Sequence, residues 1–226
     1  MIVDRLSAME PPEGKQIIIT GTDLHPVCKG VGPLQTAVHH EETDVLMAYH
    51  MIQEATNGHK SIRVVSDDTD VLVILAHHLY SRTNGLPEDL VLTMEACTSS
   101  KPVIDEGEIV RIHKNIMPNL LCAHAFTGCD TVSSFSGIGK LTVLKKLVSF
   151  NGSMRLGDLS VEKDDIIQPC LQFASMLYSH DPGADLATMH AEIFRRKIKG
   201  RRHIALKLNS LPPTMTSFEA HCLRAH

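Results

Sequence analysis

The sequence contains no tryptophan, and aromatic residues make up only 4% of its 226 residues. A chain of this length can bury a sizeable core, so aliphatic side chains must supply most of it. Hydrophobic residues reach 43% and charged residues 21%, close to globular averages, so the composition does not indicate disorder. We therefore predict one sizeable domain, or one domain with a small appendage.

A secretory leader, a bilayer-length apolar run and a Cys-x-x-Cys pair are also missing. We predict a nuclear or cytoplasmic protein that is not secreted and has no membrane partner, with six reduced and mostly buried thiols. Zinc stays open as an alternative because Cys122, His124 and Cys129 are close in the sequence, although their spacing matches no common ligand pattern.

Neither sign of charge dominates, since 22 basic residues face 26 acidic ones for a net charge of -4. A net acidic chain argues weakly against a nucleic-acid partner. Five of the acidic residues are assigned to metal below, and setting them aside leaves 21 acids against 22 bases. Net charge therefore decides little, and the distribution of charge matters more.

Hydrophobic spacing predicts an α/β fold with a mainly parallel sheet, followed by a helical C-terminal region. Strands are expected at residues 17–19, 62–65 and 90–94, of which the second is the clearest buried strand because it is rich in β-branched residues. A Gly- and Pro-rich loop is expected at 21–38. Apolar periodicity predicts helices at 45–55, 105–116, 119–126, 140–148, 169–178, 185–199 and 215–225.

Two finer expectations concern the helical region. In the helix at 140–148, an apolar stripe is expected from Leu141, Leu144, Leu147 and Val148. Thr214 is expected to cap the last helix. The Gly- and Ser-rich residues 151–158 mark the best candidate boundary between core and tail.

Three acidic clusters stand at the ends of predicted elements. Ligand sites in open α/β sheets lie beyond the carboxyl ends of the strands, and grouped carboxylates repel one another unless a cation lies between them. Mg²⁺ or Mn²⁺ prefers such oxygen ligands, and two ions about 4 Å apart can drive phosphodiester cleavage. Each cluster alone is equally typical of helix caps or turns. The clusters are Glu41-Glu42-Thr43-Asp44, Asp67-Asp68-Thr69-Asp70 and Asp130 in Thr127-Gly128-Cys129-Asp130.

At these residues the sequence resembles the PIN-like superfamily of flap-endonuclease-like 5′ nucleases. The residues of these motifs are most similar to those of a poorly characterised, mobile-element-associated animal family within this superfamily. No match is found to the metal-binding Asp of that superfamily's first strand, so the chain is expected to be a fragment, a truncated product or a degenerate copy. The similar segments, in order, are His40-Glu41-Glu42-Thr43-Asp44, residues 64–72, Thr127-Gly128-Cys129-Asp130 and Ser136-Gly137-Ile138-Gly139-Lys140.

The resemblance implies a PIN-like three-layer α/β/α core at residues 1–150, without its N-terminal strand. It also implies a helix-turn-helix element near 128–148 that grips the nucleic-acid backbone, and a helical extension at 151–226. Glu41 and Asp67 would support the metal ligands or face the substrate. The residues that would ligate the one or, more typically, two Mg²⁺ or Mn²⁺ ions and serve catalysis are Glu42, Asp44, Asp68, Asp70 and Asp130.

Glycines and lysines after Asp130 suggest contact with a nucleic-acid backbone. Glycine lets the backbone approach a phosphate closely, and a helix N-terminus offers free N–H groups. An ordinary Gly-rich turn with a solvated lysine face is the alternative. The candidate nucleic-acid-binding residues are Gly137, Gly139, Lys140, Lys145 and Lys146.

These residues predict metal-dependent hydrolysis of nucleic acids, with DNA expected rather than RNA and with little sequence specificity. A catalytically degenerate, nucleic-acid-binding remnant is one alternative. A haloacid-dehalogenase-type phosphatase is another, because Asp68-Thr69-Asp70 after a strand is similar to that class's nucleophile motif. The 14 histidines are expected to be surface or packing residues, since none has a spacing that demands a catalytic role.

Overall fold

The computed structural model divides the chain into two compact units, Met1–His50 and Met51–His226. The division falls inside helix α2 (Thr43–Thr56), which is itself one continuous helix. The boundary that the sequence predicts between a core at 1–150 and an extension at 151–226 falls within the second unit. The structure describes residues 5, 8–19, 27–30, 42–82, 85–98, 101–178, 185–199 and 208–226.

The first unit contains an antiparallel strand pair, β1 (Gln16–Ile19) and β2 (Val27–Gly30). The strand predicted at 17–19 is confirmed. Gly30 has a φ of +93°, and a Cβ at this position would come within 2.2 Å of the Lys15 carbonyl oxygen, so only glycine fits. The loop predicted at 21–38 contains β2, while its other residues lie outside the described part of the chain.

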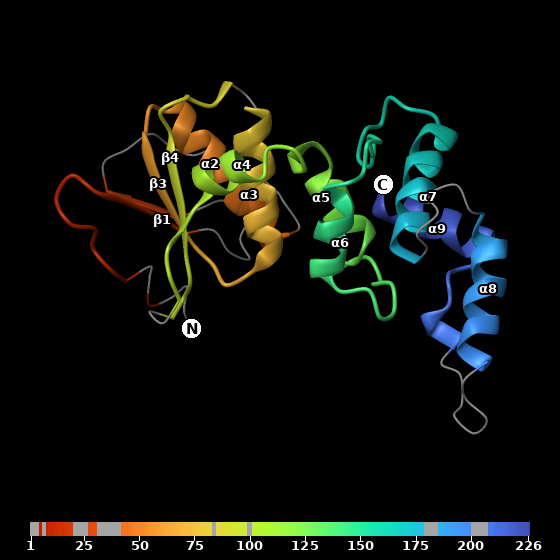
Figure 1. Ribbon diagram of the computed structural model, residues 1–226. Helices are drawn as coiled ribbons and strands as arrows, with labels where there is room; N and C mark the ends of the chain where they lie inside the picture. The colour runs from red at the N-terminus through yellow and green to blue at the C-terminus, as the bar shows by residue number, and fades with distance from the viewer. Residues whose placement is uncertain are drawn as a thin grey trace. The chain divides into compact units, whose positions relative to one another are not determined.

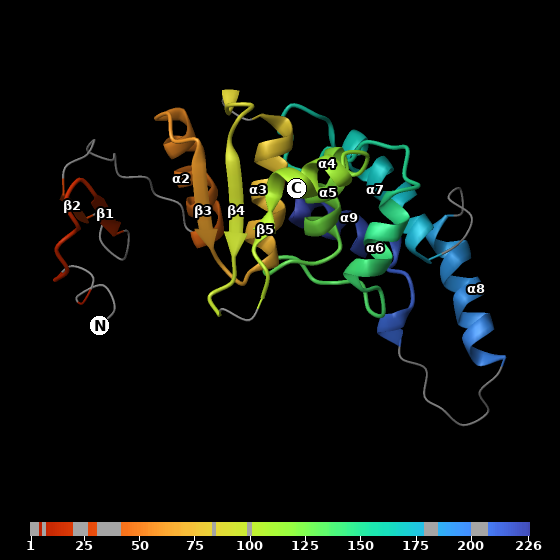
Figure 2. The same ribbon diagram turned by 60° about the vertical axis from the view of Figure 1, so that its left-hand side comes forward.

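The second unit is built on a small mixed sheet in the order β3 (Ser61–Val65), β4 (Val91–Glu95), β5 (Ile104–Asp105), which Figure 2 shows side by side. Strands β3 and β4 are parallel, and β4 and β5 are antiparallel. The α/β class is therefore confirmed, but only one of the two strand pairs in this sheet is parallel.

The expectation that residues 62–65 form a buried strand is wrong in its burial. β3 forms as predicted, but its side chains alternate between half-buried and exposed, and Val65 is 53% exposed. β3 stands at the end of the strand order, whereas β4 stands in the middle and buries Leu92 and Met94. β-branched composition indicates a strand, but burial depends on which elements cover it.

Helix α3 (Thr69–Ser81) makes the crossover from β3 to β4. Its apolar side chains recur at helical spacing, and Val71, Leu75 and Leu79 are buried on one stripe. The apolar run after Asp70 therefore belongs to this helix. α3 packs against α4 (Glu106–Ile112) and α5 (Met117–Phe126), so it joins the sheet to the helical part of the second unit.

The helical part is formed by α5, α6 (Lys140–Leu147), α7 (Lys163–Tyr178), α8 (Leu186–Ile198), the short 3-10 helix η2 (Leu208–Ser210) and α9 (Met215–Ala225), as Figure 1 shows. Three rings form the centre of its core, because Phe126 contacts both Phe173 and Phe218. Among the described residues, no helix is long and apolar enough to cross a membrane.

A buried asparagine ties α5 to the chain beyond residue 150. The Asn119 Nδ2 donates to the Gly152 carbonyl oxygen at 2.9 Å, and the Met154 N–H donates to Asn119 Oδ1 at 2.8 Å. Asn119 is only 8% exposed, so both bonds satisfy polar groups that have little access to water.

The helix predictions hold well where capping signals are present. α9 covers the predicted residues 215–225, and Thr214 caps it by accepting a bond from the Ser217 N–H. α7 begins at Lys163, earlier than predicted, because Pro169 lies inside this helix instead of at its start. α4 ends at Ile112, earlier than the predicted 116.

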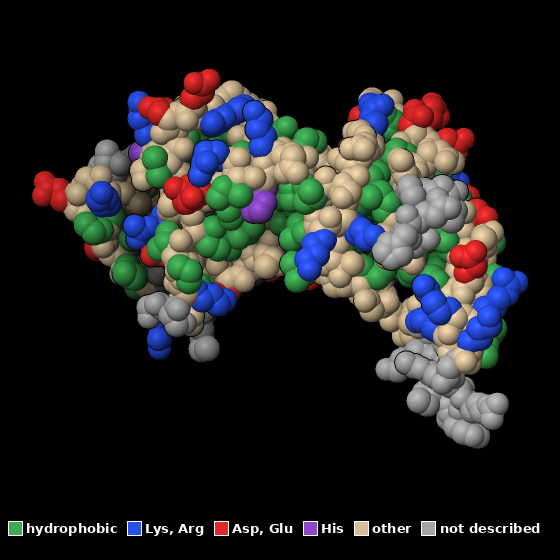
Figure 3. Space-filling model, viewed as in Figure 1, with side chains coloured by type: hydrophobic (Ala, Val, Ile, Leu, Met, Phe, Trp, Pro, Cys, Tyr) green, Lys and Arg blue, Asp and Glu red, His purple; other side chains and the backbone are tan. Residues whose placement is uncertain are grey.

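The predicted stripe on α6 is wrong in part. Leu147 is buried as expected, but the second buried residue is Val143, while Leu141 and Val148 are 67% and 60% exposed. α6 contacts α5 and α7 through its Val143 and Leu147 side. Leu141, Leu144 and Val148 line an apolar groove of about 530 Å³ together with residues of α3, α4 and α5. It lies on a face where Figure 3 shows hydrophobic side chains gathered.

Candidate metal centre

The start of α3 holds two aspartates in a defined arrangement. Asp68 is the N-cap in extended conformation, and its Oδ1 accepts a bond from the Asp70 N–H at 2.9 Å. The Ser66 Oγ in turn accepts the Asp68 N–H at 3.1 Å. The helix N-terminus carries a partial positive charge, which offsets part of the repulsion between the two carboxylates.

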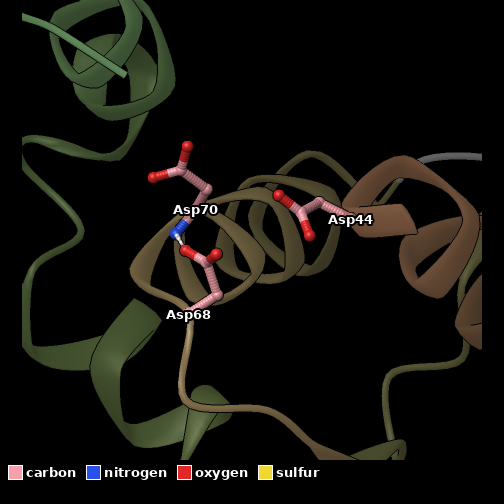
Figure 4. Close-up of side chains that lie close together, drawn as sticks. All are labelled: Asp44, Asp68 and Asp70. Atoms are coloured by element: carbon pink, nitrogen blue, oxygen red, sulfur yellow. Dashed lines mark hydrogen bonds between the residues drawn. The ribbon is translucent and has the colours of Figure 1, made fainter. Parts of the chain in front are cut away.

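A third carboxylate belongs to the same group. Asp44 lies in the first turn of α2, and one carboxylate oxygen each of Asp44, Asp68 and Asp70 lies within 4.8 Å of the others. Figure 4 shows these three side chains and the bond from the Asp70 N–H to Asp68. Three negative groups this close favour a cation between them.

The ligand chemistry of this group fits a hard divalent cation. All three side chains are carboxylates, and Mg²⁺ and Mn²⁺ prefer oxygen ligands and keep several waters. The zinc alternative gains nothing, because in the described part of the chain no ligand group includes a cysteine. The Cys122 thiol instead contacts the Met154 and Leu156 carbonyl oxygens at 3.5 and 3.7 Å.

His124, which the sequence suggested as a packing residue or as part of the zinc alternative, lies directly against this group. Its Nε2 is 2.7 Å from Asp70 Oδ1, and the two side chains are only 12% and 22% exposed. His124 comes from α5 and Asp70 from α3, so the contact is tertiary and leaves no local spacing signal. The only hint in the sequence was its place on the helix that leads into Thr127-Gly128-Cys129-Asp130.

A cavity of about 460 Å³ brings several predicted site residues to one wall. Asp70, His124, Asp130 and Lys140 all line it. Asp130 is exposed there, but it does not belong to the group of three carboxylates. The cavity is therefore lined by the carboxylates of Asp70, from α3, and Asp130, from the loop after α5, together with one histidine and one lysine.

Lys140 stabilises the end of α5 from this cavity wall. Its ammonium donates to the His124 carbonyl oxygen at 2.7 Å, to the Gly128 carbonyl oxygen and to Thr127 Oγ1 at 3.4 Å. These bonds satisfy carbonyls that a helix end leaves without partners. Burial lowers the pKa of Lys140, and the negative charge of Asp70 acts in the opposite direction.

The remaining predicted residues fall in three places. Gly137 adopts a φ of +82° in a turn that suits glycine, and Gly139 caps α6 without a side-chain bond. Lys145 is exposed and Lys146 half-buried, both in the last turn of α6. The third place is at the acidic clusters, where Glu42 is exposed just before α2 and outside the carboxylate group, and Glu41 lies outside the described residues.

Asp67 does not belong to the group of three carboxylates and has hydrogen-bond partners of its own. Its carboxylate accepts bonds from the Lys101 ammonium at 3.1 Å and from the Cys97 N–H at 3.2 Å. The bond from Lys101 is the main cause that holds the pKa of Asp67 below its ordinary value, and Cys97 adds to it. Asp67 thus links the end of β3 to the segment after β4.

Comparison of this chain with protein-family models, with curated proteins and with solved structures finds no match. Function must therefore be inferred from the residues of the site. The arrangement offers carboxylate oxygens from two helices for a hard cation. Beside them lies a cavity that carries a histidine, a lysine and a further carboxylate. A site of this kind suits hydrolysis of an anionic substrate.

Proposed function

We propose that this protein is a divalent-metal-dependent nuclease, which hydrolyses nucleic-acid phosphodiester bonds on a PIN-like three-layer α/β/α core. The observation that carries the proposal is the group of Asp44, Asp68 and Asp70, whose ligand atoms lie within 4.8 Å of one another. Mg²⁺ or Mn²⁺ bound there would polarise the phosphate and lower the pKa of a bound water.

The chain's own residues have distinct parts in this proposal. Asp68 and Asp70 hold the cation at the N-terminus of α3, and Asp44 holds it from α2. His124 is a positioning residue, since its ring nitrogen lies 2.7 Å from Asp70 Oδ1 and would hold that carboxylate in place for a cation. Asp130 lines the 460 Å³ cavity together with Asp70 and His124. From there it would accept hydrogen bonds from waters bound to the cation.

The turn before α6 supplies the contact with the nucleic-acid backbone. Because Gly139 provides no side-chain cap, the N–H groups that precede Thr142 in α6 are left for a phosphate, while the Thr142 N–H donates to the Gly139 carbonyl oxygen. Lys145 and Lys146 add positive charge on the same helix. Contacts to phosphates carry no base information, so the proposed enzyme has low sequence specificity, with DNA as the favoured substrate.

The sharpest test removes a charge without removing a helix cap. Asp68→Asn keeps an oxygen that can accept the Asp70 N–H, so the cap is preserved while the carboxylate is lost. Asp185→Asn is the matched control, because Asp185 caps α8 in the same way by accepting from the Thr188 N–H at 2.9 Å. Cleavage of branched and single-stranded DNA is measured with Mn²⁺.

We expect Asp68→Asn to reduce cleavage by about 100-fold or more, beyond what loss of an outer contact usually costs. Asp185→Asn is expected to cleave like the unchanged protein. The proposal fails if the unchanged protein cleaves neither substrate with Mn²⁺, or if both variants cleave equally well.

A non-catalytic, nucleic-acid-binding descendant of such a nuclease is the second candidate. One observation favours it: in the described residues Glu42 and Asp130 are not part of the carboxylate group, so the ligands gathered there suit one ion better than two. DNA binding without cleavage, unaffected by Asp68→Asn, would select this candidate over the enzyme.

A further inference from the structure

The 460 Å³ cavity lined by Asp70 and Asp130, called the acidic cavity below, shares lining residues with a larger cleft. This cleft has a volume of about 1110 Å³ and lies between residues 133–139 and the segments around α8, η2 and α9. Ser133 and Ser134 line both hollows, so both border this stretch of chain. A ligand that follows this stretch of chain from one hollow would reach the other.

The chemistry of this cleft differs from that of the acidic cavity. No Asp or Glu is among the described residues that line it, although the chain as a whole is net acidic. Arg224 lines the cleft and is exposed, and it forms no ion pair with any described carboxylate. An acid-free wall with an available guanidinium favours an anionic ligand.

Polar and aromatic side chains complete the wall. Thr214 and Ser217 place hydroxyl groups at the N-terminus of α9, where the helix carries partial positive charge. The His190 ring is fixed by a 2.9 Å bond between Nδ1 and the Pro212 carbonyl oxygen. Tyr178 is half-buried and held edge-on by Phe135, with ring centroids 6.0 Å apart.

We propose that this cleft binds a single nucleic-acid strand next to the phosphate that is cleaved, with Arg224 on a backbone phosphate and Tyr178 against a base. This inference rests on the proposed function. A duplex is held mainly by many lysines and arginines along its phosphates, whereas the described residues that line the cleft include one arginine. Aromatic rings on a positive groove are the platform that unstacked bases use.

Binding of a fluorescent single-stranded oligonucleotide tests the inference in EDTA, where cleavage cannot occur. The full chain is compared with Arg224→Gln and Tyr178→Leu. The matched control is Arg82→Gln, which removes the same charge at the opposite end of α3, roughly 20 Å along the helix from Asp70. We expect about tenfold weaker binding for Arg224→Gln, with a salt slope shallower by about 0.7. Tyr178→Leu is expected to weaken binding at least about fivefold.

Equal binding by Arg224→Gln and Arg82→Gln overturns the inference, as does equal affinity of the unchanged protein for strand and duplex. Cleavage with Mn²⁺, measured in parallel, separates this result from the fate of the nuclease. Selective loss of strand binding without any cleavage supports the cleft and rejects the enzyme. Cleavage with an unchanged KM in Arg224→Gln supports the enzyme and rejects the cleft.

Discussion

The starts of α3 and α4 use the same local device with opposite results. Each helix begins with an aspartate cap followed by a second acid, Asp68 with Asp70 in α3 and Asp105 with Glu106 in α4. Asp70 is partly exposed and meets His124. Glu106 is fully buried, and neither of its oxygens has a hydrogen-bond partner among the described residues.

The difference shows that surroundings, and not the cap itself, decide what an acidic helix start does. At α3 the two aspartates meet Asp44 and His124, a set of side chains that can hold a cation. At α4 burial is the main cause that raises the pKa of Glu106 to about 8, and the neighbouring Asp105 adds to it. One start is suited to a cation, and the other holds a neutral carboxyl group.

Loss of a carboxylate at α3 should have the largest effect. Asp70→Asn is expected to weaken Mn²⁺ binding by about 100-fold or more, since a direct ligand matters more than an outer one. Isothermal titration calorimetry measures the affinity. Asp105→Asn, which removes a carboxylate at the start of α4, should bind Mn²⁺ unchanged, and an equal loss in both variants would abolish the distinction between the two starts.

His124 should sharpen the role of Asp70. His124→Ala is expected to weaken Mn²⁺ binding by about 10- to 100-fold, because Asp70 loses the group that orients it. His124→Gln should recover part of the affinity through its amide donor, and kcat at saturating Mn²⁺ should change less than the Mn²⁺ requirement. His59→Ala, on an exposed histidine, is the control. An unchanged Mn²⁺ affinity in His124→Ala would remove His124 from the site.

Glu106 should make stability depend on pH. The unfolded chain releases this proton near the ordinary pKa of 4.5, while the folded protein keeps it up to about 8. Between these values the folded state binds more protons, so stability falls as pH rises, by at most about 1.4 kcal/mol per pH unit. In urea unfolding, Glu106→Gln should flatten this slope, and the exposed Glu108→Gln should not. A slope that survives Glu106→Gln would show that other groups cause it.

The smallest effects are expected for loss of a helix cap, and the two caps Asp105 and Asp185 should contribute similar amounts to the unfolding free energy. Asp105→Ala and Asp185→Ala are each expected to cost about 1 kcal/mol of unfolding free energy, whereas the corresponding asparagine variants should cost a few tenths. Chemical denaturation measures both pairs. A much larger loss for one alanine variant would mean that its aspartate does more than cap a helix.

Sequence patterns predicted most helices because apolar spacing and caps are local. α9 with its Thr214 cap is the best case, and the misplaced start of α7 shows how a single proline misleads. The exposure of β3 was not predictable, since it follows from the strand's place in the sheet and from its packing. The mixed sheet likewise depends on pairing between distant residues.

The candidate site also contains residues that local sequence patterns marked and residues that only tertiary contacts bring together. Asp68 and Asp70 were candidates because they follow a strand, and the structure groups them with Asp44. His124 contacts Asp70 across 54 residues of sequence, and no local pattern marks such a pair. The bonds of Lys140 to the end of α5 could not be predicted either, because a lysine at the start of a helix is equally typical of a phosphate contact.

Crystals soaked with Mn²⁺ and measured for anomalous scattering test the central claim most directly. The account predicts an anomalous peak roughly 2.2 Å from carboxylate oxygens of Asp68 and Asp70, with Asp44 as the third ligand, and no peak in Asp70→Asn crystals. A peak elsewhere, or none while the three carboxylates point apart, would contradict the claim that this protein gathers acids from separate helices around one cation.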